Sequence, residues 1–101
     1  MLNSKQRAYL RSLANPLECQ FHVGKTDVGD ALVHSLEDLL SNRELVKASV
    51  LKSAASPVSE IATQLADAVG AEVVQVIGRK FVLYRRSDKL AKEGRSLVLP
   101  R

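Results

Sequence analysis

Hydrophobic and polar residues follow one another along this chain at two spacings, one typical of helices and one typical of strands. The first segment has helical spacing, and its apolar positions are Leu10, Leu13, Ala14 and Leu17. Asn3 can cap the start of this helix, and Gln6 stands three residues later, in the position of a capping box. Asn15 precedes Pro16, and a residue before proline disfavours the helical conformation, so the helix is predicted to end there.

A strand and a second helix are predicted next. Residues 19–23 alternate between apolar and polar side chains, which indicates a strand with Cys19 in the core and His22 on the exposed face. The tetrapeptide Gly24-Lys25-Thr26-Asp27 is predicted to be a loop. The apolar face of the following helix consists of Val28, Leu32, Leu36, Leu39 and Leu40. This helix is expected to end at Asn42 and Arg43, before a second strand at Glu44–Leu51.

Ser56 and Pro57 predict the start of a third helix, with the serine as its cap and the proline in the first helical position. The buried face of this helix is predicted to be Ile61, Ala62, Leu65, Ala66 and Val69. Gly70 supplies a left-handed residue to end it. Two strands then follow, at Glu72–Ile77 and Phe81–Arg85, joined by a tight turn at Gly78-Arg79-Lys80.

The predicted order is therefore α-β-α-β-α-β-β, which gives an α/β single domain with a four-stranded mixed sheet and helices packed on it. A chain of 101 residues is the size of one domain. The simplest packing places all three helices on one face of the sheet. Residues 1–86 are predicted to form the domain and residues 87–101 a basic C-terminal tail. Within this tail, Leu97–Pro100 is a candidate for a short edge strand.

The net charge of +4 is concentrated at one end of the chain. Nine basic and nine acidic residues lie between positions 1 and 84, whereas positions 85–101 hold six basic residues and two acidic ones. A basic end of this kind either binds a polyanion such as nucleic acid or is simply a solvated tail. Only 4% of the residues are aromatic, which argues against recognition by base stacking across the sheet.

The sequence predicts a cytoplasmic location. No apolar run approaches the ~18 residues that a membrane span needs, and the first residues do not have the pattern of a signal peptide. The single cysteine, Cys19, cannot form an internal disulfide, which suits a reducing compartment.

Little in the sequence indicates catalysis. The two histidines, His22 and His34, have no spacing that would bind zinc. Cys19 and His22 have opposite parity on the predicted strand, so they should not form a nucleophile and base pair. Gly24-Lys25-Thr26 lacks the preceding glycine of a phosphate-binding Walker motif. We therefore expect no enzymatic activity, no cofactor, no metal and no small-molecule substrate.

The loop at Gly24 is the better candidate for a site. It connects the end of a strand to the start of a helix, where free backbone N–H groups and the helix dipole favour an anion. Gly24 would let a phosphodiester approach the backbone closely, while Lys25 adds a charge and Thr26 a hydroxyl donor. The alternative interpretation is an ordinary turn between a strand and a helix.

Several motifs together resemble the bacterial YhbY-like proteins, which are free-standing CRM domains (chloroplast RNA splicing and ribosome maturation). The motifs are Val23-Gly24-Lys25, Arg43–Lys47, Val74–Gly78 and Val82–Arg85, together with the opening Ser4–Arg7 and the closing Leu97–Pro100. The resemblance implies a fold similar to the C-terminal domain of the third bacterial translation initiation factor. It also implies RNA binding and association with precursors of the large ribosomal subunit.

The chain departs from the family's pattern at one loop. The family usually has Gly-x-x-Gly here, similar to the loop with which KH domains hold a nucleotide backbone. In this sequence Asp27 replaces the second glycine, Gly29 stands where the family has threonine, and Ala31 replaces its next glycine. We expect Asp27 to cap the second helix rather than to face the RNA.

The resemblance and the charge pattern together define the candidate RNA contacts. Besides the loop, these are Lys5, Arg7 and Arg11 on the first helix, Arg79 and Lys80 at the hairpin tip, and Arg85 and Arg86 at the start of the tail. Each could instead be an ordinary solvated side chain. Our hypothesis is a monomeric protein that binds the backbone of ribosomal RNA during large-subunit assembly. The alternative is an adaptor that docks on ribosomal proteins.

Overall fold

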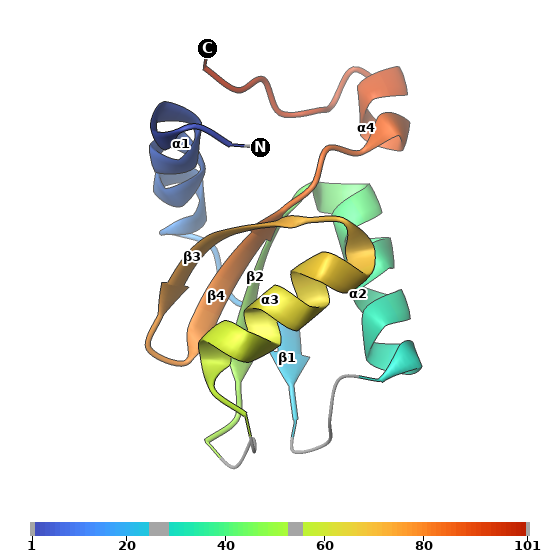
Figure 1. Ribbon diagram of the computed structural model, residues 1–101. Helices are drawn as coiled ribbons and strands as arrows, with labels where there is room; N and C mark the ends of the chain where they lie inside the picture. Colours follow the sequence, from blue (N-terminus) through green and yellow to red (C-terminus); the bar gives the residue numbers. More distant parts are fainter. Residues whose placement is uncertain (1, 25–28, 53–55, 101) are drawn as a thin grey trace.

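The computed structural model describes residues 2–24, 29–52 and 56–100. The helices are α1 (Ser4–Ala14), α2 (Asp30–Arg43), α3 (Val58–Val69) and α4 (Asp88–Lys92), and the strands are β1 (Phe21–Val23), β2 (Leu45–Val50), β3 (Glu72–Ile77) and β4 (Lys80–Tyr84) (Figure 1). None of the described helices is long and apolar enough to span a bilayer.

The strands form one mixed sheet in the order β1-β2-β4-β3. β1 and β2 are parallel, because α2 carries the chain back between them, whereas β4 runs antiparallel to both β2 and β3. A bulge between Val73 and Gln75 interrupts the register of β3 with β4. The α/β class and the mixed four-stranded sheet are thus confirmed.

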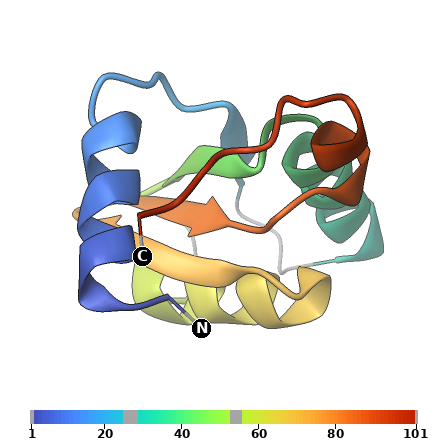
Figure 2. The same cartoon turned by 90° about the horizontal axis from the view of Figure 1, so that it is seen from above.

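The sheet is covered on both faces. On one face, α2 and α3 pack against the sheet through a core of fourteen buried residues that includes Leu36, Leu65 and Phe81. On the other face, α1 packs through Leu10 and Ala14, and the segment after α4 adds Leu97 and Leu99. Figure 2 shows this last segment running from α4 back across the molecule towards α1.

The prediction that all three helices share one face is therefore wrong. The reason lies in β4, where Phe81, Val82, Leu83 and Tyr84 are all buried. Because successive side chains of a strand point to opposite faces, a central strand without a polar face needs cover on both sides. α1 and the C-terminal segment provide the second cover.

The expected signals for helix α1 are confirmed. The Asn3 side chain accepts from the Gln6 N–H (2.8 Å), and the Gln6 side chain accepts from the Asn3 N–H (3.1 Å), which makes the capping box. Gly70 ends α3 in the left-handed conformation (φ 68°), as predicted.

Two helix caps and one strand residue differ from expectation. The N-cap of α3 is Pro57 rather than Ser56, and neither it nor Gly29, the N-cap of α2, makes a side-chain cap hydrogen bond. Asp27, which was expected to cap α2, lies outside the described residues. The N-cap of α2 in the structure is Gly29. Cys19 is half-buried rather than part of the core, because β1 begins only at Phe21.

The tail beyond Arg86 is ordered against the domain. Ser87 caps the short helix α4 with its hydroxyl, and Leu90 is buried. Residues 97–100 form no strand, so the candidate edge strand is wrong; Leu97 and Leu99 instead pack on the second core.

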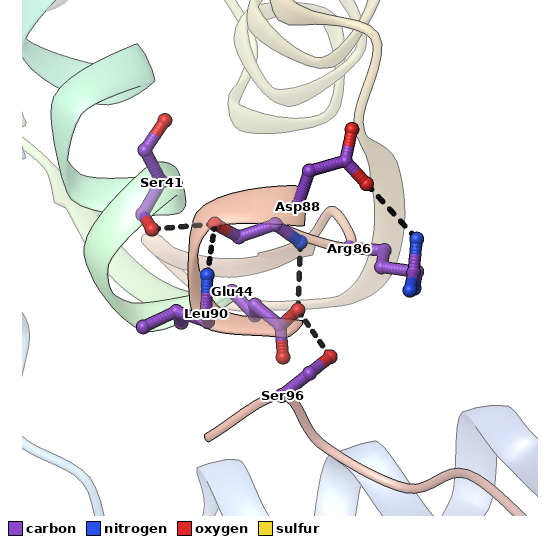
Figure 3. Close-up of polar contacts among 7 residues, drawn as sticks. Ser41, Glu44, Arg86, Asp88, Leu90 and Ser96 are labelled. Atoms are coloured by element: carbon purple, nitrogen blue, oxygen red, sulfur yellow. Dashed lines mark hydrogen bonds and ion pairs between the residues drawn. The ribbon is translucent and has the colours of Figure 1, made fainter. Parts of the chain in front are cut away.

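Glu44 holds this tail in place. Its carboxylate is fully buried and accepts from the Ser87 N–H (2.6 Å), the Ser96 hydroxyl (2.7 Å) and the Leu97 N–H (2.7 Å). Figure 3 shows Glu44 lying between the start of α4 and Ser96. Its backbone has a positive φ of 63°, unusual for a residue with a side chain. The turn from α2 into β2 thereby points this carboxylate at a segment about fifty residues further along the chain.

Candidate functional site

The ends of β1 and β2 and the tip of the β3–β4 hairpin meet at one end of the sheet, in the lower part of Figure 1. The Leu51 N–H donates to the Val23 carbonyl (3.0 Å), and the Val50 N–H donates to the Arg79 carbonyl (2.8 Å). The Arg79 guanidinium donates to the Leu51 carbonyl (3.4 Å). Gly24 follows Val23, and Lys80 follows Arg79. We call the group Gly24, Leu51, Arg79 and Lys80 the sheet end.

Gly24 has open surroundings. Among the described residues, a Cβ atom built on it would have one neighbour within 4 Å, the Leu51 Cδ1 atom at 4.0 Å, and its φ is not in the left-handed region. Nothing in the described fold therefore requires glycine at this position, and a larger side chain would project where a ligand could approach. The expected partners Lys25 and Thr26 lie outside the described residues.

A row of side chains crosses the sheet next to this end, on the face that carries α1. The register pairs His22 with Ser49, Ser49 with Lys80, and Lys80 with Ile77. His22 is exposed, as predicted, and its Nδ1 lies 2.7 Å from the Ser49 hydroxyl oxygen. The Lys80 side chain is exposed, and its ammonium has no hydrogen-bond or ion-pair partner among the described residues. This row is uncovered because α1 ends before reaching it.

The end of α1 and the uncovered sheet enclose a cavity of about 220 Å³. Its lining residues are Ala14, Asn15, Lys47, Gln75, Ile77, Lys80, Phe81 and Val82. The Lys47 ammonium donates to the carbonyls of Ala14 (3.3 Å) and Asn15 (3.4 Å) at the C-terminal end of α1, where the helix dipole favours a cation. Lys47 is thus fixed in position, and the cavity has positive charge at two places in its wall.

Arg7, a candidate on α1, lies apart from Gly24. Arg7 is half-buried and donates to the carbonyls of Val73 and Val74, which holds α1 to the start of β3. Val73 pairs with Leu83 of β4, which in turn pairs with Val46 of β2. Val46 lies four residues before Val50, the end of β2, and is therefore about 13 Å from that end along the strand. Lys5 and Arg11 are exposed. The structure therefore does not bring Arg7 to Gly24.

Arg85 is enclosed at the opposite end of β4. Its guanidinium donates to the Glu37 carboxylate (3.1 Å), the Val69 carbonyl (2.9 Å) and the Ser41 hydroxyl (3.0 Å), so it joins α2, α3 and β4. These contacts occupy most of its donors. Arg85 therefore has a structural role, since its hydrogen bonds hold α2 and α3 to the end of β4.

Arg86 is exposed and pairs with Asp88 (2.9 Å), as Figure 3 shows. It also influences the neighbouring Tyr84. Burial raises the pKa of the Tyr84 hydroxyl above its ordinary value of 10.0, the Glu44 carboxylate raises it further, and Arg86 lowers it. Arg86 therefore lies with the Glu44 cluster, away from the sheet end.

The predicted cations thus fall into three groups. Arg79 and Lys80 lie with Gly24, Arg7 lies against β3 with Lys5 and Arg11 exposed on the same helix, and Arg85 and Arg86 lie at the far end of β4. Sequence reasoning missed Lys47, Gln75 and Ile77. Lys47 and Gln75 are polar residues inside strands, a pattern that could have indicated an uncovered part of the sheet.

Metal binding finds no support in the part of the chain that the structure describes. No group of three or more His, Cys, Asp or Glu side chains there could hold a metal ion. His34 lies on α2, where its Nε2 is 3.8 Å from Asp38 on the next turn, and both side chains are exposed.

Comparison with known proteins shows similarity over the whole chain. The sequence profile of the CRS1 / YhbY (CRM) domain matches residues 2–85. Probable RNA-binding protein YqeI of Bacillus subtilis (strain 168) is 37% identical over 100 residues, which cover 99% of this chain and 100% of that protein. Probable RNA-binding protein MJ0652 of Methanocaldococcus jannaschii is 36% identical over 86 residues, covering 83% of this chain and 63% of the relative.

A solved structure is also similar. The solution structure of the hypothetical protein SAV1595 from Staphylococcus aureus matches with a TM-score of 0.79 and 38% identity. The match covers 99% of this chain and 100% of that one. Fold and sequence therefore point to the same group of proteins.

Proposed function

Because this chain belongs to the CRS1 / YhbY (CRM) domain family, we propose that it is an RNA-binding protein that holds a sugar-phosphate backbone at its sheet end. Relatives that match nearly their full length or most of it are named RNA-binding proteins. The observation that carries the proposal is the meeting of Gly24, Arg79 and Lys80 at one exposed end of the sheet.

The chemistry of this end suits a phosphodiester. Lys80 is a free cation among the described residues, and Arg79 is exposed with one weak contact to a carbonyl at 3.4 Å. The open surroundings of Gly24 allow a phosphate to approach the backbone closely. Such contacts fix position on a strand without reading its sequence.

The finer parts of the proposal concern the RNA and its place in the cell. The motifs shared with YhbY-like proteins support ribosomal RNA in precursors of the large subunit, met in the cytoplasm. The protein would act there by binding, without catalysing a reaction.

Binding of a single-stranded ribosomal RNA fragment at several salt concentrations tests the phosphate contacts. If three to five phosphates are neutralised, log affinity should fall against log salt with a slope of about −2 to −3.5. The double variant Arg79→Ala/Lys80→Ala should weaken binding and flatten the slope by about 1.4. Gly24→Ala should also weaken binding while leaving the fold intact, because within the described part of the chain its Cβ meets only Leu51.

The matched control is Lys5→Ala/Arg11→Ala, which removes two cations that are also exposed, from α1. If this pair lowers affinity and the Arg79/Lys80 pair does not, RNA binds on α1 and the sheet-end site is wrong. A slope near zero, together with binding to a purified ribosomal protein in the absence of RNA, would support the adaptor alternative instead.

A further inference from the structure

We propose that the cavity beside the end of α1 receives the base of an unpaired nucleotide of the bound RNA. The inference rests on the proposed function and extends it, because it adds recognition of a base to the binding of phosphates at the sheet end. It assigns a binding role to Lys47, Gln75 and Ile77, which lie outside the loop and the cation groups considered so far.

The cavity adjoins the phosphate contacts. Lys80 belongs to both, since it lines the cavity and follows Arg79 at the sheet end. Ile77 faces Lys80 in the register of the hairpin. A strand whose phosphate contacts Lys80 would therefore have the attached base next to the cavity mouth.

The size and the wall of the cavity suit one planar polar ring. Its volume of about 220 Å³ is below the ~300–1,000 Å³ typical of pockets for drug-sized ligands. Ile77 is 59% exposed and provides an apolar surface, while the Gln75 amide offers both a donor and an acceptor. Two of the three Lys47 donors are used on carbonyls, which leaves one for an acceptor on a base edge.

Charge favours RNA over an apolar peptide as the occupant. Among the residues that the structure describes, the lining contains two lysines and no acidic side chain. An exposed isoleucine beside Lys80 fits a ring attached to an anionic backbone better than it fits a purely apolar side chain. The base must be unpaired, because the edges and faces of a base in a helix are already occupied by pairing and stacking.

The test uses three RNA probes of equal length and equal charge per strand: an unstructured single strand, the same strand with abasic sites, and a duplex. Hydrogen bonds from a base edge to the Gln75 amide and the Lys47 ammonium should together contribute at least ~1 kcal/mol, so the intact strand should bind at least about fivefold more tightly than the abasic one. Ile77→Ala and Gln75→Ala should each reduce this ratio towards one.

Val98→Ala is the matched control. Val98 is an apolar residue that is 85% exposed and does not line the cavity, so its variant should keep the full ratio. Circular dichroism verifies that each variant is folded, and Gln75→Ala gives a second reading if Ile77→Ala is not.

The outcomes separate this inference from the proposed function. Equal affinity for intact and abasic strands, with the salt dependence retained, overturns the base cavity and leaves the phosphate grip standing. Failure of every probe to bind overturns both. A purified protein partner whose binding is lost in Ile77→Ala while the RNA ratio is unchanged would identify the cavity as a protein-docking site and also overturn the inference.

Discussion

Replacing Glu44 by glutamine should destabilise the domain strongly, although the two side chains have nearly the same shape. The carboxylate is fully buried and accepts three hydrogen bonds of 2.6–2.7 Å. An amide keeps one acceptor oxygen and turns the other into a donor. Whichever way it is oriented, the N–H of Ser87 or of Leu97 then faces a donor and loses its partner.

The magnitude follows from these contacts. A hydrogen bond to a charged group contributes about 1.5–3 kcal/mol, and a buried N–H left without a partner costs about 1–3 kcal/mol. Part of this loss is offset, because a buried carboxylate is itself costly to desolvate. We therefore expect Glu44→Gln to lower the free energy of unfolding by about 2–4 kcal/mol, which corresponds to a fall in Tm of roughly 10–20 °C for a domain of this size.

The assay is thermal and urea unfolding followed by circular dichroism, with amide hydrogen exchange at Leu97 as a local reading. Exchange at Leu97 should accelerate, because this N–H loses its acceptor or the tail that carries it is released. The control is Glu93→Gln, which changes an exposed glutamate of the same tail that pairs with Arg95 (3.1 Å) and should alter stability by at most ~0.5 kcal/mol. If Glu44→Gln melts together with Glu93→Gln and the wild type, the carboxylate does not anchor the tail.

Three further predictions concern other parts of the fold. In a Tyr9→Phe background Tyr84 is the sole tyrosine, and its absorbance titration should give a pKa above 10.0, mainly because of burial. Since the pKa is raised in the folded state, the free energy of unfolding should fall as the pH rises from about 10 through that pKa. A titration midpoint at or below 10 would contradict this. Arg85→Ala should lower the free energy of unfolding by about 1–3 kcal/mol in denaturant melts, because it removes the hydrogen bonds that join α2, α3 and β4. An unchanged free energy of unfolding would show that these hydrogen bonds do not contribute to stability. Gly70→Ala should lower the free energy of unfolding by ~1 kcal/mol in the same melts, because a residue with a side chain is strained at φ 68° even where the surrounding space is open. A variant more stable than the wild type would refute that reasoning.

The order of the elements was predictable because local signals carried it. The Asn3–Gln6 capping box, the apolar face of α3 and the terminating Gly70 each depend on residues a few positions apart. The side of the sheet on which α1 packs is not local information. It depends on both faces of β4 being apolar, and the run Phe81–Tyr84 in the sequence could have indicated this.

The candidate site was predicted less well than the fold. Gly24, Arg79 and Lys80 meet because β1, β2 and the hairpin are in register, and no spacing along the chain specifies that register. Arg85 looked like the start of a free basic tail, yet its partners are supplied by α2 and α3. Glu44 gave no local signal, because its contacts lie more than forty residues away.

The position of β4 in the sheet has a consequence for how this protein is made. β4 is the last strand in the sequence but lies between β2 and β3. While a ribosome is still synthesising the residues before Lys80, the nascent chain can pair β1 with β2 but has no partner for the other edge of β2 or for β3. We expect the sheet to form only after Tyr84 has left the exit tunnel, and the second core to close only once Leu97 and Leu99 have followed it.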